Sequence, residues 1–108
     1  MQYINHECDP VYAKVDHLLD VLTKSKALHI LLELHLSNRT MGFTEIKKRV
    51  DSSSTTVSRR LDELESFDLI TQIEDNTGGS KFSYGLTSKA KMLAPCIQSL
   101  YDWCAVNR

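Results

Sequence analysis

Apolar side chains recur with helical spacing along most of this chain and with strand-like spacing in one shorter part. Helices are predicted at residues 11–22, 25–36, 44–50, 53–67 and 88–106. Residues 69–74 and 81–86 read as strands, and the six residues between them, DNTGGS, suit a hairpin turn because they tolerate positive φ. One more short strand is expected just before Phe43. This order predicts a mainly α protein with a small β-hairpin.

Capping residues set the predicted helix boundaries. Asp9 suits an N-cap, and Pro10 follows at a position where a missing amide costs nothing. Further helix starts are predicted at Ser25, Ser53 and Thr87. Pro95 interrupts the last helical pattern, so we expect a kink there or a division into two helical pieces.

The segment 53–67 has the most informative pattern in the chain. Val57, Leu61 and Leu64 form an apolar stripe, and Thr55 and Arg59 fall nearly opposite it on a helical wheel. Such a face suits the major groove of DNA, because Arg binds guanine bidentately and Ser or Thr can meet either base type. The alternative is an ordinary solvated helix.

A tight connection joins this segment to the short helix before it, which is typical of a helix-turn-helix. The following hairpin and long helix complete the layout of a winged helix. Its recognition helix would span about 53–67 and its wing about 74–82. The candidate DNA-contacting residues are Ser54, Thr55, Thr56, Ser58, Arg59 and Arg60 in the recognition helix, Lys47, Lys48 and Arg49 in the preceding helix, and Ser80 and Lys81 in the wing.

Two of these arginines have alternative roles. Arg59 could instead pair with Glu63, four residues later, in a contact worth only about 0.3–0.5 kcal/mol. Arg60 lies nearer the core edge, so either a phosphate contact or an intramolecular pair would suit it. The hydroxyl residues could simply start the helix.

The placement of charged residues along the chain favours nucleic-acid binding more than the net charge does. The formal net charge is −1 and the pI about 6.4, whereas DNA-binding domains are more often basic. Residues 39–60, however, hold six Lys or Arg against two acids, and residues 61–75 hold six acids and no Lys or Arg. This asymmetry predicts a positive surface for phosphates and an acidic surface facing away from them. Chance clustering on solvated faces is the alternative.

Length and cysteine usage predict the class and compartment of the protein. Its 108 residues suit a single domain, 1–108. Three cysteines without regular spacing, no secretory pattern and no run long enough to span a membrane favour a reducing cytoplasm. No catalytic motif appears, so we expect no enzyme activity, no cofactor and no metal.

The sequence resembles the HxlR-type winged-helix transcription regulators, cousins of the MarR type, from about Cys8 to Trp103. The matching pieces are CDPV near the start, VSRRLDELE in the recognition helix, YGLT closing the wing and LYDW near the end. The resemblance implies a cytoplasmic, homodimeric regulator of double-stranded DNA with N- and C-terminal dimerisation helices. Two departures are Asp9, which separates Cys8 from Pro10, and Lys24-Ser25-Lys26, where the family usually has Gly-Lys-Trp.

The two terminal helices, about 11–23 and 88–106, carry more apolar surface than one small domain needs. The candidate dimer-interface residues are Val11, Val15, Leu18, Leu93, Ile97, Leu100 and Trp103. Packing of both stripes within one chain is the alternative. Some family members sense oxidants through a cysteine near the position of Cys8, which here follows His6 by two; Cys96 and Cys104 suit inert packing.

Three functions remain open from the sequence. The first is a sequence-specific DNA-binding regulator that acts as a homodimer. The second is a winged-helix protein-interaction module that never touches DNA, which the acidic residues after Arg60 and the low pI favour. The third is a thiol-based sensor acting through Cys8. The sequence does not identify a small-molecule effector.

Overall fold

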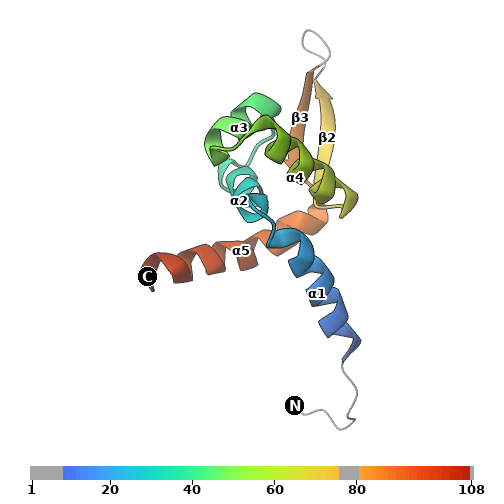
Figure 1. Ribbon diagram of the computed structural model, residues 1–108, viewed down its shortest axis with the longest axis vertical. Helices are drawn as coiled ribbons and strands as arrows, with labels where there is room; N and C mark the ends of the chain where they lie inside the picture. Colours follow the sequence, from blue (N-terminus) through green and yellow to red (C-terminus); the bar gives the residue numbers. More distant parts are fainter. Residues whose placement is uncertain (1–8, 76–80, 108) are drawn as a thin grey trace.

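The computed structural model describes residues 9–75 and 81–107, with the side chains of Asp75 and Lys81 left aside. Its helices are α1 (Pro10–Leu22), α2 (Ala27–Ser37), α3 (Phe43–Val50), α4 (Ser54–Ser66) and α5 (Ser88–Val106). Its strands are β1 (Met41–Gly42), β2 (Ile70–Asp75) and β3 (Lys81–Leu86). In Figure 1, α3, α4 and the β2–β3 hairpin lie at one end, and α1 and the C-terminal half of α5 extend from the other.

Three of the four predicted helix caps are confirmed. The Asp9 carboxylate accepts a hydrogen bond from the Val11 amide at 2.9 Å. The hydroxyls of Ser53 and Thr87 accept bonds from the amides of Thr56 and Ala90, both at 3.1 Å. These bonds satisfy amides that a helix start otherwise leaves unpaired.

The predicted cap at Ser25 is wrong. α2 begins at Ala27, and its N-cap is Lys26, whose φ of 73° is left-handed and whose side chain makes no capping bond. The Ala27 amide donates to the Lys24 carbonyl at 3.0 Å, which closes a tight turn directly after α1. Because this turn includes Ser25, the helix starts one residue later than a cap at Ser25 would give.

The last helix is not divided at Pro95. α5 runs as one element from Ser88 to Val106 with the proline inside it (Figure 1). Proline removes the hydrogen bond to the carbonyl four residues earlier, that of Lys91. Both residues are exposed, so water can satisfy the unpaired carbonyl and the helix continues.

Helices α2, α3, α4 and α5 and strands β1 and β2 contribute buried apolar side chains to one core, and α1 adds its last residue, Leu22. Strand β3 adds Tyr84 and Leu86, which pack against this core partly buried. Every buried side chain in the described residues is apolar. Each large one stabilises the fold by roughly 1.5–3 kcal/mol relative to exposure. The largest fully buried residues are Ile30, Leu31, Leu34, Met41, Ile46, Leu64, Leu69, Ile70, Val50 and Val57.

A three-stranded antiparallel sheet fixes the wing against the helices. Its order is β1-β3-β2, with Ile70 opposite Leu86 and Met41 opposite Tyr84. The expected short strand before Phe43 is therefore present as β1. Since β1 pairs with β3 and leads directly into α3, the sheet sets the position of the helix-turn-helix relative to the wing.

Candidate nucleic-acid interface

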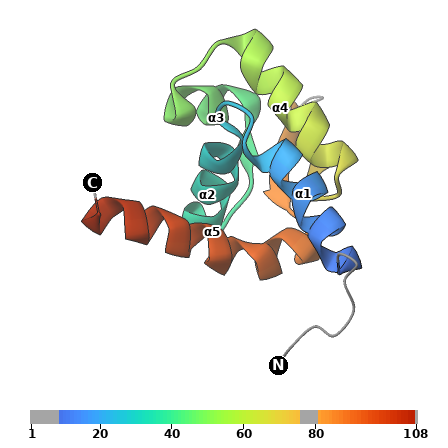
Figure 2. The same cartoon turned by 60° about the horizontal axis from the view of Figure 1, so that its bottom comes forward.

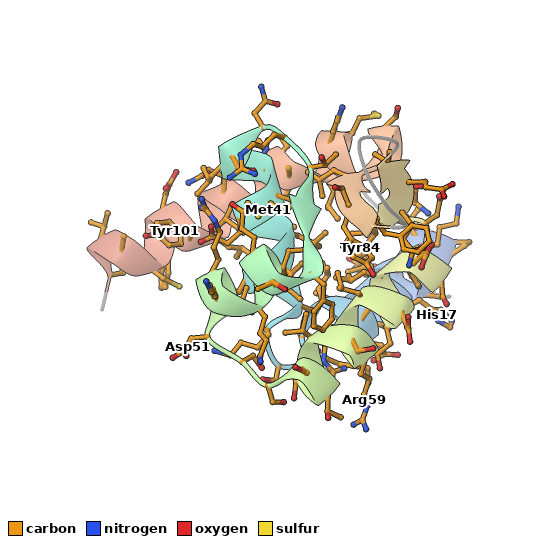
Figure 3. All side chains as sticks on the ribbon, turned by 90° about the horizontal axis from the view of Figure 1, so that it is seen from above. His17, Met41, Asp51, Arg59, Tyr84 and Tyr101 are labelled. Atoms are coloured by element: carbon orange, nitrogen blue, oxygen red, sulfur yellow. The ribbon has the colours of Figure 1, made fainter. Side chains whose placement is uncertain are left out.

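The apolar stripe of α4 is buried as predicted, and this fixes which residues face outward. Val57, Leu61 and Leu64 all belong to the core. The opposite side of the helix is therefore turned to solvent. Its exposed members are Ser54, Thr55, Ser58 and Arg59. Figure 3 shows the Arg59 side chain projecting away from the body of the protein.

The connection between α3 and α4 is tight. Asp51 ends α3 with a φ of 53°, and the Ser52 amide donates to the Lys47 carbonyl at 3.4 Å. A left-handed residue at this position reverses the chain within two or three residues. α3 and α4 therefore form the predicted helix-turn-helix, with the hydroxyl-rich start of α4 next to the turn.

A shallow hollow runs along the outer side of α4. Its lining includes the predicted residues Ser54, Thr55, Ser58 and Arg59, and three others: Phe43, Asp62 and Glu63. These three are not among the predicted DNA-contacting residues. Phe43 comes from α3, so only the packing of the two helices brings it there. The two carboxylates make one end of the hollow acidic.

Arg59 and Arg60 differ sharply in their surroundings. Arg60 pairs with Glu63 three residues later, and its side chain is only 11% exposed. Its Nε is buried without a hydrogen-bond partner. Arg59 makes no ion pair with any described residue, and the alternative pairing of Arg59 with Glu63 is therefore wrong. Arg60 has taken the intramolecular role that the sequence left open.

The three basic residues of α3 also differ in their ion pairs and in their exposure to solvent. Arg49 donates from Nη1 to Glu33 of α2 and from Nε to Glu45, both at 3.2 Å. Lys47 is half-buried and Lys48 exposed, and neither pairs with an acid in the part of the chain that the structure describes. Lys48 is thus the more accessible cation of this helix.

An ion-pair network that sequence patterns did not indicate surrounds Glu45. Arg39, in the turn before β1, binds the Glu45 carboxylate through both terminal nitrogens. This bond raises the pKa of Arg39 and holds the pKa of Glu45 below its usual value of 4.5, with further help from the charge of Arg49. The network links α2, the turn and α3. Its partners lie up to 16 residues apart, beyond any helical spacing.

The predicted wing contacts are only partly visible. Ser80 lies outside the described residues, and for Lys81 only the backbone is described, in register with Asp75. Ile73 and Phe82 are exposed on the two strands. The pairing of β2 with β3 therefore fixes the position of the two wing strands.

The C-terminal half of α5 extends away from the helix-turn-helix (Figure 2), and both terminal helices expose much apolar surface. Among the predicted dimer residues, Val11, Val15, Leu100 and Trp103 are exposed, the last at 63%. Leu18 and Leu93 pack partly on the core, and Ile97 is only 4% exposed within it. Ile97 therefore packs mainly inside its own subunit, where it also lines an apolar groove between α2 and α5, and its place in a dimer interface stays a prediction.

The cysteines differ from expectation. Cys96 and Cys104 are free and exposed rather than packed inside the chain. The buried positions of α5 are Ala90, Ala94 and Ile97, so Cys96 lies beside this stripe and Cys104 lies beyond its end. Cys8 and His6 lie outside the described residues. Within residues 9–75 and 81–107, no group of three potential metal ligands comes together, and no helix is long and apolar enough to cross a membrane.

A helix-turn-helix followed by an antiparallel hairpin and a closing helix defines a winged helix-turn-helix protein. The chain belongs to the HxlR-like helix-turn-helix family, whose profile matches residues 21–108. The protein is thus a DNA-binding transcriptional regulator, and the resemblance noted in the sequence is confirmed. No curated protein matches the chain.

Solved structures of bacterial regulators share this fold. A MarR-family regulator from Porphyromonas gingivalis W83 is 17% identical, with a TM-score of 0.78 and complete coverage of both chains. The reduced form of YodB from B. subtilis is 23% identical, with a TM-score of 0.74 over 90% of this chain and 91% of that one. MepR from S. aureus, solved with DNA, is 23% identical, with a TM-score of 0.68 over 89% and 79%.

Proposed function

We propose that this regulator binds operator DNA as a homodimer, with α4 of each subunit in a major groove. One observation carries the proposal: Thr55 and Arg59 are exposed on the side of α4 opposite a fully buried stripe, and Arg59 has no described ion-pair partner. A rigid helix with a free guanidinium can read guanine, and such a contact discriminates by roughly 1–3 kcal/mol.

The remaining candidate DNA-contacting residues fall into two groups, those that are free and those that already bind a carboxylate within the protein. Lys48 is exposed and unpaired among the described residues, so it suits a phosphate contact of the first helix of the motif. Arg49 and Arg60 already bind carboxylates, which makes them weaker candidates. Ser54, Thr56, Ser58 and the wing residues Ser80 and Lys81 stay in the proposed contact set. The DNA complex of the structurally similar MepR supports this use of the fold.

The exposed apolar residues of α1 and α5 support the homodimer. Beside them lies an apolar groove of about 480 Å³ between α2 and α5, lined by Leu28, Leu32, Leu36, Leu100 and Tyr101 among others. Contiguous apolar surface of this kind on a small domain marks an interaction site. A two-fold axis through the terminal helices would present two α4 helices to half-sites about 34–36 Å apart.

Selection of duplexes from a random pool by the purified full chain tests the proposal. We expect a two-fold symmetric consensus with half-sites one helical turn apart. Affinity for the selected duplex should fall with salt, with a slope of about −0.9 per phosphate contacted. Lys48→Ala should weaken all duplexes alike, and Lys24→Ala, in the turn far along the chain from α3, is its control. Recovery of unenriched DNA with no salt dependence would refute the proposal.

The protein-interaction alternative has one observation in its favour. Asp62 and Glu63 line the hollow on α4 and would repel DNA phosphates. If the selected pool stays random while the protein captures a basic peptide through this surface, the alternative replaces the proposal. A sensing role of Cys8 and a cytoplasmic location both stay predictions. Cys8→Ser should leave DNA affinity unchanged and remove any response to an oxidant.

A further inference from the structure

The outer side of α4 carries a polar stripe of its own. Thr55, Arg59 and Asp62 follow one another at intervals of four and three residues, which is the spacing of the buried stripe on the opposite side. All three are exposed, and all three line the hollow on α4. At about 100° per residue, Asp62 lies within about 20° of Thr55 around the helix and about 60° from Arg59. An acidic side chain therefore shares the surface that is proposed to meet base edges.

Asp62 is the free carboxylate of this surface. Glu63, the other acid that lines the hollow, is held by Arg60 three residues before it. Asp62 makes no ion pair with any residue that the structure describes, although Arg59 lines the same hollow. An unpaired negative charge on a surface for a polyanion weakens binding unless a hydrogen-bond donor meets it there. Neither the core nor the ion pairs of the fold account for Asp62.

A carboxylate in the major groove discriminates among the four bases. In its ionised form it only accepts hydrogen bonds. Guanine presents two acceptors there, and thymine presents an acceptor and a methyl group, so neither offers a donor. Adenine presents a donor next to an acceptor, whereas cytosine presents the N4 amino group alone. A carboxylate on the outer side of α4 thus favours cytosine first, adenine second, and disfavours guanine and thymine.

The spacing on the helix places Asp62 next to the base proposed for Arg59. Three residues advance an α-helix by about 4.5 Å, and neighbouring base pairs are about 3.4 Å apart. With α4 along the groove, Arg59 and Asp62 would meet adjacent base pairs. Thr55 lies about 10.5 Å from Asp62 along the axis, so it would meet a base pair about three steps away. The arginine only donates and the aspartate only accepts, so their two base pairs must differ in chemistry.

We infer that Asp62 is a specificity-determining residue, which accepts a hydrogen bond from N4 of a cytosine in the base pair adjacent to the guanine of Arg59. The inference rests on the proposed function of α4 and adds the class of half-site that it recognises. The carboxylate acts by repulsion as well as by attraction. Because it repels phosphates and acceptor edges, it weakens binding to wrong sites more than to the right one.

Parallel selections from one random pool test the inference, with the full natural chain, Asp62→Asn and Arg59→Ala. The natural chain should enrich a cytosine in the base pair beside an enriched guanine. Asp62→Asn should exchange this cytosine for adenine and keep the guanine, because a side-chain amide binds N6 and N7 of adenine bidentately. Arg59→Ala should lose the guanine and keep the cytosine. A purely structural role of Asp62 would change neither base.

Binding to four duplexes that differ only at the cytosine position gives the size of the effect. The natural chain should bind the cytosine duplex at least about tenfold more tightly than the thymine duplex. Asp62→Asn should reduce this ratio to about twofold and bind the thymine duplex more tightly than the natural chain does, since the repulsive charge is gone. Glu65→Gln removes an exposed carboxylate of the same helix outside the hollow lining and should leave the ratio unchanged.

The failure of this inference differs from the failure of the proposed function. If the natural chain and Asp62→Asn enrich the same bases at every position, the role of Asp62 is overturned while DNA recognition by α4 stands. The same holds if Asp62→Asn and Glu65→Gln change the cytosine-to-thymine ratio alike. If the natural chain enriches no sequence at all, the proposed function fails and the inference fails with it. Only the first two outcomes leave an enriched guanine that depends on Arg59.

Discussion

Val57 and Arg59 lie two residues apart on α4 and face opposite environments. The Val57 side chain is fully buried among the helices, while Arg59 is exposed and unpaired in the described part of the protein. A separation of two residues turns a helix by about 200°, so burial of one side chain forces the other outward. The anchoring of α4 in the core thus determines which side of the helix can meet DNA.

Substitution of Arg59 should affect specificity without affecting the fold. Arg59→Ala should reduce preference for the selected duplex by about 1–3 kcal/mol, because a bidentate contact to guanine is lost. The free energy of unfolding should change by less than about 0.5 kcal/mol, as is usual for exposed residues. Competition binding with selected and scrambled duplexes measures the first quantity, and urea denaturation the second.

The matched comparison for Arg59 is Arg60, its neighbour in the chain. Arg60→Ala removes the ion pair with Glu63 and a mostly buried side chain, so it should lower stability more than specificity. If Arg59→Ala and Arg60→Ala reduce sequence preference equally, the assignment of Arg59 as the base-reading arginine is wrong.

Truncation of the buried stripe should destabilise the whole domain. Leu64→Ala should lower the free energy of unfolding by about 2–5 kcal/mol, because Leu64 is fully buried and its loss leaves a cavity. Met92→Ala, on the exposed side of α5, should cost less than about 0.5 kcal/mol. Urea denaturation followed by circular dichroism compares the two. A small effect of Leu64→Ala would mean that α4 is not anchored as described.

Acid should weaken the network around Glu45. The Arg39 contact lowers the pKa of Glu45 in the folded protein, so its contribution to stability is present above the ordinary value of 4.5 and is lost as the pH falls below it. Glu45→Gln should therefore flatten the decline of stability between neutral pH and the acid range. Thermal unfolding of both proteins at a series of pH values measures this effect.

The control for the Glu45 experiment is Glu65→Gln, which removes an exposed carboxylate of α4 that makes no described ion pair. This variant should keep the acid dependence of the natural sequence. A Glu45→Gln protein with an unchanged acid limb would show that the network contributes nothing measurable, as many exposed ion pairs do.

Charge placed on the second half of α5 should dissociate the proposed dimer. Leu100→Glu should raise the dimer dissociation constant at least about tenfold, because an unpaired carboxylate would have to be buried in the interface. Met92→Glu, on the same helix but outside the groove lining, is the control. Sedimentation equilibrium gives both constants. Equal constants for the two variants would place the interface elsewhere.

The sequence alone determined the local features of this protein. Caps at Asp9, Ser53 and Thr87 and the stripe beginning at Val57 were correct, because capping bonds and helical periodicity act within four residues. The hairpin followed from a change of period around a Gly-rich turn. These features were sufficient to predict a winged helix and to place Thr55 and Arg59 on its exposed face.

Tertiary structure decided which side chains remain free. Glu33 binds Arg49 from 16 residues away, and Ile97 is buried because α2 and α5 pack together, which no spacing along the chain encodes. The hollow on α4 likewise includes Phe43 from α3. Ion pairing and burial depend on distances in space between separate elements, whereas sequence periodicity reports only which face of each element is apolar.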